Sequence, residues 1–129
     1  MKNYSDSKNI LIKPEDAFAK SIVADGSNIS VDTDGNKYLL AGQLMGANKD
    51  IALNDDAIAQ PVSDPKQAQG ILRNDYNFKD GKQYISIITN GYINIAQMSD
   101  NVKPFYTADV VEALKAQLPG VHFVNNATK

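Results

Sequence analysis

The sequence feature that most constrains the fold is a surplus of Asp and Asn over Glu. The chain has 129 residues, of which 13 are Asp, 13 are Asn and only 2 are Glu. Asp and Asn side chains bond to nearby backbone groups and favour turns and caps, whereas Glu favours helix interiors. Four of them directly precede a glycine, at Asp25-Gly26, Asp34-Gly35, Asp80-Gly81 and Asn90-Gly91. The sequence therefore predicts many short elements joined by tight turns and argues against a helical bundle.

Composition excludes several classes of function. There is no Cys and a single His, which excludes disulfides, thiolate metal sites, cysteine nucleophiles and paired-imidazole sites within the chain. The net charge is −2 and Arg73 is the single arginine, so no basic footprint for nucleic acid is present. No apolar run approaches the roughly 18 residues that cross a bilayer. We expect no cofactor, no nucleic-acid partner and no membrane partner.

The sequence predicts one domain, residues 10–129, preceded by a flexible N-terminal arm, residues 1–9. The arm is polar and lacks the apolar segment of a secretory signal. Asn9–Lys13 is a short apolar run that suits either a strand or an anchoring clip. Pro14 at a first helical position, followed by acidic residues, predicts a short N-terminal helix that extends through Lys20.

The middle of the chain reads as short strands and hairpins. Segment 84–89 is rich in β-branched residues, and Asn90-Gly91 after it is a hairpin signal. A turn at Asp25-Gly26 predicts that strand 21–24 pairs with a returning strand at 28–31. The other strands expected from apolar runs are 38–40, 43–46, 70–72 and 92–95.

The C-terminal part differs, because it carries helix signals. Thr107 is a suitable N-cap, and Pro119-Gly120 ends the segment. Between them an apolar stripe at helical spacing consists of Val110, Val111, Leu114 and Leu118. A last strand, 121–124, would place Val121 and Phe123 on one face. The predicted fold class is α+β, mainly β, with a short C-terminal helix and one short N-terminal helix.

Candidate sites for ions or catalysis have simpler structural interpretations. Asp32–Asn36 resembles the opening of a calcium loop, but the sixth and twelfth positions are Lys37 and Gln43, so we expect a hairpin turn. Asp55-Asp56 suits a solvated loop, and His122 suits a structural or surface histidine. Neither a nucleophile elbow nor a glycine-rich phosphate loop occurs. We predict no catalytic, cofactor-binding or metal-binding residue.

Aromatic residues gather in the second half of the chain. They suit packing within the domain, and as a group they also suit a contact surface, because aromatic side chains carry much interface energy. Tyr84 belongs to this group. The candidates for a subunit interface are Tyr76, Phe78, Tyr92, Phe105 and Tyr106.

The order of short motifs resembles a known family. Ala41-Gly42-Gln43-Leu44-Met45-Gly46 is followed by a variable stretch and then by Gly70-Ile71-Leu72-Arg73-Asn74-Asp75. The remaining pieces are Asp80-Gly81-Lys82, Ile85-Ser86-Ile87-Ile88, Gly91-Tyr92-Ile93-Asn94 and Leu118-Pro119-Gly120-Val121-His122-Phe123-Val124. This order, over about Val31 to Val124, is similar to the lambda-like head decoration proteins of tailed bacteriophages. It is also similar to the related head fibre proteins of phages that infect Gram-positive hosts. Gln43 and the longer segment 1–30 depart from that pattern.

The resemblance implies a non-enzymatic virion protein with a decoration-type domain. Such a protein forms a homotrimer, binds the major capsid protein on the outer capsid surface and stabilises the shell, after assembly in the host cytoplasm. In the family an N-terminal arm commonly adds a strand to a shell protein. By analogy, the candidate capsid contacts are Asn9, Ile10, Leu11, Ile12 and Lys13.

Two other functions are compatible with the composition. A head fibre or host-surface module would bind glycan through exposed Tyr and Asn or Asp groups. A small enzyme working with carboxylates alone, as glycosidases do, would draw on the Asp residues with Glu15 and Glu112.

Overall fold

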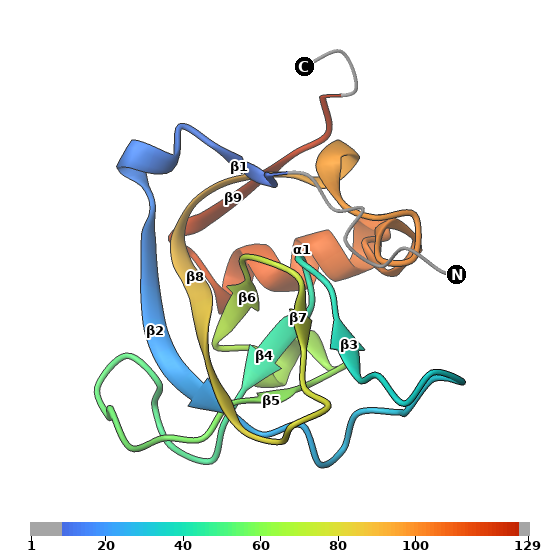
Figure 1. The fold of residues 1–129 in the computed structure, drawn as a ribbon. Coiled ribbons are helices and arrows are strands. Elements are labelled where there is room, and N and C mark those ends of the chain that lie inside the picture. Colours follow the sequence, from blue (N-terminus) through green and yellow to red (C-terminus); the bar gives the residue numbers. More distant parts are fainter. Residues whose placement is uncertain (1–8, 127–129) are drawn as a thin grey trace.

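One long strand, β8 (Gln83–Asn94), organises the fold (Figure 1). The structure is a computed structural model that describes residues 9–126. In it β8 pairs antiparallel with three strands and parallel with a fourth. The antiparallel partners are β1 (Leu11–Ile12), β2 (Phe18–Ala24) and β6 (Gly70–Leu72), and the parallel partner is β9 (Val121–Val124).

The remaining elements extend and cover this sheet. Strands β4 (Leu44–Gly46) and β5 (Gln60–Pro61) continue it beyond β6, giving the order β1-β8-β6-β4-β5. A separate two-stranded sheet pairs β3 (Tyr38–Leu39) with β7 (Tyr76–Asn77). The α-helix is α1 (Ala108–Gln117), and 3-10 turns occupy Pro14–Asp16 (η1), Pro65–Gln67 (η2), Ile95–Gln97 (η3) and Lys103–Phe105 (η4). The described chain is therefore mainly β with one C-terminal α-helix, as predicted.

The centre of the sheet is buried on both faces. Neighbouring residues of a strand point to opposite faces, so two consecutive apolar residues place one side chain on each face. The cross-strand register places Leu44, Ile71 and Ile88 directly opposite one another, and we call these three the first row. On the other face Leu72 lies opposite Ile87, and Met45, which lies opposite Gly70, packs in the same cluster; we call Met45, Leu72 and Ile87 the second row. All six side chains are fully buried.

Different segments cover the two rows. Leu114 and Leu118 of the C-terminal segment pack in the cluster of the first row. Ile51, Ala57 and Phe78, from loops on the other side, pack in the cluster of the second row. Because each row has its own cover, the sheet separates two hydrophobic clusters.

The predicted hairpin at Asn90-Gly91 is wrong, because β8 runs straight through it. Gly91 has φ of +142°, and a Cβ there would lie 2.9 Å from the Ala17 Cβ. The dipeptide therefore marks a special backbone conformation in a continuous strand, which lets another segment approach closely. Residues after it pair with β1 and β9, which are distant in sequence, and not with the preceding part of β8.

Two predictions for the N-terminal part are also wrong. The helix expected through Lys20 is only the 3-10 turn η1, and Phe18 already begins β2. Pairing with β8 along the whole of β2 outweighs the local helix signal. The strand expected at 28–31 is absent, because the partner of β2 is β8 and the Asp25 N–H donates to the Ala59 carbonyl.

The helix and strand predicted at the C-terminus are confirmed. Thr107 caps α1, its hydroxyl accepting from the Val110 N–H at 3.3 Å. Strand β9 follows at the expected residues, with Val121 buried, Phe123 half-buried and His122 between them exposed.

Truncation of the central rows should destabilise the protein strongly. We expect Ile87→Ala and Ile88→Ala each to lower the free energy of unfolding by about 2–5 kcal/mol, because each leaves a cavity in a different cluster. Urea unfolding followed by circular dichroism measures this. Tyr84→Ala is the matched control on the same strand, because its side chain is 71% exposed and the expected change is within about 0.5 kcal/mol. Losses below about 1 kcal/mol at both isoleucines would contradict a sheet buried on both faces.

Candidate interaction surface

The N-terminal candidates divide into buried and accessible side chains. Ile10 is fully buried and Leu11 is 5% exposed, both in the cluster of the first row. The Ile10 carbonyl also accepts from the Asn94 N–H at 2.8 Å. Ile10 and Leu11 thus serve the core and offer no side chain to another protein while β1 stays paired. Asn9 and Lys13 are exposed and Ile12 is half-buried.

The flexible arm expected at residues 1–9 lies outside the described residues except for Asn9. The Asn9 Oδ1 accepts from the Leu11 N–H at 3.1 Å, a local bond that holds the start of β1. Lys13 ends this strand in the left-handed region, with φ of 55°. The segment is therefore a short strand, one of the two forms that the sequence allowed.

The aromatic candidates also divide. Phe78 is fully buried and Tyr106 is 9% exposed, so these two side chains pack within the domain. Tyr76 and Phe105 are half-buried, and the Tyr76 hydroxyl accepts from the Ser86 N–H at 2.9 Å. Tyr92 is 46% exposed and is the candidate most accessible to a partner. For Phe78 and Tyr106, the interpretation as residues packed within the domain is therefore the one that the structure supports.

Strand register brings Tyr92 into a row with two other side chains. Ile12 of β1 lies opposite Tyr92, and His122 of β9 lies opposite it on the other side. Directly paired residues of neighbouring strands project from the same face of a sheet. The Tyr92 and His122 rings stack with centroids 4.8 Å apart and planes at 25°. We call Ile12, Tyr92 and His122 the outer row.

The outer row is on the face of the sheet opposite to the core. Each residue of the outer row has a neighbour on its own strand that points inward and packs in or against the cluster of the first row. These neighbours are Leu11 on β1, Ile93 on β8 and Phe123 on β9. Tyr92 and His122 remain exposed. The row contains no carboxylate or ammonium group, and its side chains are aromatic or aliphatic. Such a surface suits non-covalent association with another protein.

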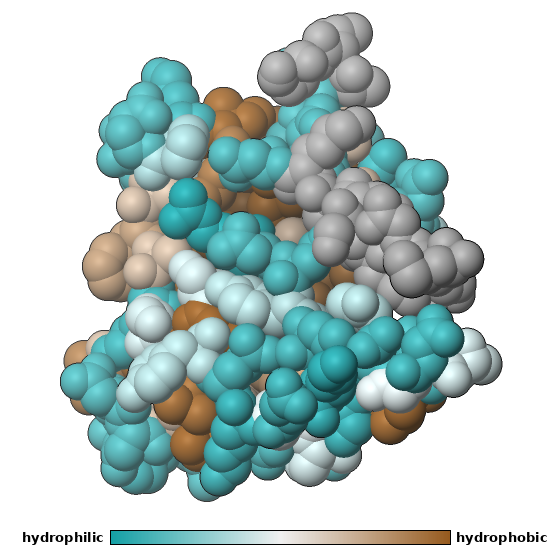
Figure 2. Space-filling model, in the orientation of Figure 1, coloured by the Kyte–Doolittle hydropathy of each residue, from teal (hydrophilic) through white to brown (hydrophobic). Residues whose placement is uncertain are grey.

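Other exposed apolar side chains are more scattered. Phe18 is 58% exposed and lies opposite Asn90, two residues before Tyr92 on β8. Leu53 is 80% exposed, in the loop between β4 and β5. Figure 2 shows one face of the molecule, where hydrophobic patches are separated by hydrophilic side chains. Sequence reasoning missed Phe18 because it placed this residue inside a helix.

The acidic segments have structural roles. The Asp32 Oδ1 accepts from the N–H groups of Asp34 and Asn36, both at 2.9 Å, which closes a turn. The turn is at the expected residues, but it is not the expected hairpin, because the strand predicted at 28–31 is absent. The Lys49 ammonium lies 2.7 Å from an Asp56 carboxylate oxygen and lowers the pKa of that carboxyl. Within residues 9–126, no three His, Asp or Glu side chains gather where they could hold a metal ion. No helix in the same range is long and apolar enough to span a bilayer.

Comparison with known proteins adds no family to this picture. Protein-family models, curated protein sequences and solved structures yield no significant match to the chain. The role of the outer row is therefore inferred from its own residues and from its place in the fold.

Burial of Tyr106 generates a pH prediction. Its hydroxyl donates to the Gly42 carbonyl, and burial raises the pKa of Tyr106 above its usual value. Because the folded pKa is the higher one, the stability it contributes is fully present below about pH 10, the unfolded pKa, and is lost as pH rises above it. In an alkaline titration followed by tyrosinate absorbance, we expect Tyr106 to ionise only as the protein unfolds.

Tyr106→Phe is the control for this titration. It should remove the late ionisation step and, by leaving the Gly42 carbonyl without its donor, cost roughly 1–3 kcal/mol of stability. Ionisation of Tyr106, measured as the difference between the titrations of the two proteins, while near-ultraviolet circular dichroism stays native would contradict the burial of this hydroxyl.

Proposed function

We propose that this protein is a non-enzymatic structural protein of a tailed-phage virion, which decorates the outer capsid surface as a homotrimer and stabilises the shell. The observation that carries the proposal is the outer row, in which the stacked rings of Tyr92 and His122 are exposed beside the half-buried Ile12 on three paired strands. Burial of such a surface against a second copy would supply the contact between subunits.

The arrangement of the motif segments supports the same proposal. Ala41–Gly46, Gly70–Asp75 and Ile85–Ile88, which carry the resemblance to decoration proteins, contribute to β4, β6 and β8. These three strands are neighbours in the sheet and form both central rows. The resemblance therefore rests on segments that build one continuous part of the core.

A decoration protein needs contact surfaces and no catalytic group. In a trimer three copies of a modest contact act together, so the avidity for a shell can greatly exceed the affinity of one copy. The outer row suits the subunit contact, while Asn9 and Lys13, exposed at the start of the described chain, remain our candidates for contact with the major capsid protein.

The proposal predicts how assembly responds to a change in the outer row. Light scattering coupled to size exclusion should give three times the chain mass for the natural protein at micromolar concentration. Tyr92→Ser should shift this mass to that of a single chain, because it removes the largest aromatic surface of the row. Tyr84→Ser is the matched control, because Tyr84 is also an exposed tyrosine of β8 but lies outside the row.

Capsid binding is tested with the same variants. The natural protein and Tyr84→Ser should sediment with capsids of the virus that encodes the chain, and Tyr92→Ser should bind at least tenfold more weakly because it loses avidity. A strict monomer that ignores these capsids would overturn the proposal. A trimer that survives Tyr92→Ser would move the subunit contact away from the outer row.

A further inference from the structure

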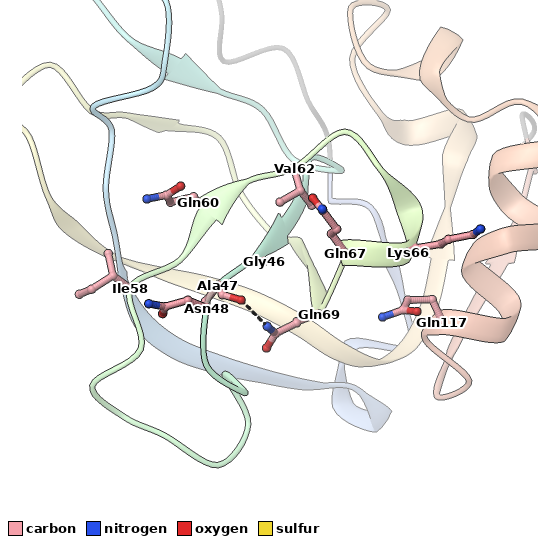
Figure 3. A pocket seen from close by; sticks show the side chains of 10 residues that line it. All are labelled: Gly46, Ala47, Asn48, Ile58, Gln60, Val62, Lys66, Gln67, Gln69 and Gln117. Atoms are coloured by element: carbon pink, nitrogen blue, oxygen red, sulfur yellow. Dashed lines mark hydrogen bonds between the residues drawn. The ribbon is translucent and has the colours of Figure 1, made fainter.

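A groove of about 640 Å³ opens at the β4–β5 side of the molecule (Figure 3). It lies between these strands, the turn η2 and the end of α1. Five of the ten residues that line it carry a side-chain amide, and none is Asp or Glu. The amides are Asn48, Gln60, Gln67, Gln69 and Gln117. This is an unusual lining in a chain with 15 acidic residues.

Gln69 holds the wall of the groove in place. Its Oε1 accepts from the Ile51 N–H at 2.6 Å, and its Nε2 donates to the carbonyls of Ala47 and Lys49, each at 3.0 Å. These three bonds fix the segment that carries Asn48, which Figure 3 shows beside Gln69. The groove wall is therefore organised before any ligand arrives, which lowers the entropic cost of binding.

Other amides in the groove keep free hydrogen-bonding capacity. The Gln117 Nε2 donates to the Ala68 carbonyl at 2.9 Å, which orients this amide. The side chains of Asn48 and Gln67 bond to no other described residue. An amide offers both a carbonyl acceptor and an N–H donor pair, so these groups match ligands that donate and accept at each position.

The groove is elongated. A second hollow of about 440 Å³ shares Asn48, Gln69 and Gln117 with it. The charged residues of this second hollow are Lys49 and Asp50. Lys49 is already paired with Asp56 at 2.7 Å, so it offers little attraction to an anion. Lys66, exposed on η2, is the charged residue that lines the larger groove. The other lining residues of that groove are amide, apolar or glycine, so the joined hollows suit a chain-like ligand that is held mainly by hydrogen bonds.

We propose that the amide-lined groove binds a neutral oligosaccharide. Sugar hydroxyls donate and accept hydrogen bonds, as the side chains of Asn48, Gln67 and Gln117 do. Ile58 and Val62 supply apolar surface for the C–H faces of the sugar rings. A peptide fits less well, because Pro61 in the adjacent edge strand β5 has no N–H to pair with an added strand.

The test uses the whole protein and an array of neutral hexose, N-acetylhexosamine, sialylated and uronic-acid glycans. We expect binding to neutral glycans, with shifts in the Asn and Gln side-chain amide signals in ¹⁵N-correlated NMR spectra. The double variant Asn48→Ala/Gln67→Ala should weaken binding at least tenfold and keep the folded spectrum, since both residues are exposed and their side chains bond to no described residue. Asn74→Ala, an exposed amide outside the groove, is the matched control and should bind normally.

Three results would overturn this assignment: no binding to any neutral glycan, binding to acidic glycans alone, or full binding by the double variant. If capsid peptides displace the glycan and bind more tightly than it does, the groove would instead be assigned to a protein ligand. The inference does not rest on the proposed trimer, because the groove lies within one chain. A monomer that ignores the capsids and binds neutral glycan would therefore overturn the decoration proposal and keep this one.

Discussion

Burial of the central sheet on both faces is the constraint on which the rest of the structure depends. Each fully buried aliphatic side chain contributes roughly 1.5–3 kcal/mol, and six such side chains form the two rows. The rows require close strand packing. A Cβ at Gly70 would lie 2.3 Å from the Ile87 Cγ2, so a glycine at this position lets β6 lie against β8. Loss of this contact would open both hydrophobic clusters together.

Strand β8 links this core to the molecular surface. Its first half contributes Ile88 to the cluster of the first row and contributes Ile85 and Ile87 to the cluster of the second row. Beyond Gly91 the strand leaves the central rows and pairs with β1 and β9, and there its outward side chain, Tyr92, is uncovered. The same continuous strand therefore stabilises the domain and presents the surface that we propose for assembly.

The two proposed surfaces are at opposite ends of the sheet. The outer row involves β1, which begins the strand order, and the amide-lined groove adjoins β5, which ends it. Assembly through one surface would thus leave the other accessible. Their chemistry also differs, since the outer row is aromatic and aliphatic whereas the groove offers amides. A protein contact suits the first surface and a hydroxyl-rich ligand suits the second.

Sequence reasoning succeeded where the signal was local. Thr107 caps the predicted helix, and Asp32 closes a turn at the predicted residues, although not a hairpin, because each depends on bonds to residues two to four positions away. It failed at Asn90-Gly91, where pairing with β1 and β9, which are distant in sequence, keeps β8 extended beyond the glycine. In the candidate surface, the sequence singled out Ile12 and Tyr92 for different contacts, and only the register placed them side by side.

By itself, then, the sequence determined the mainly β class, the turns rich in Asp and Asn, and the capped C-terminal helix. The tertiary structure decided which aromatic residues are buried: Tyr106 and Tyr92 are the same residue type, yet Tyr106 is 9% exposed and Tyr92 is 46% exposed. It also decided that Gln117 of α1 shares one groove with four amides from residues 48–69. The physical reason is that caps and turns are satisfied within a few residues, whereas burial and register depend on strands that meet across the whole chain.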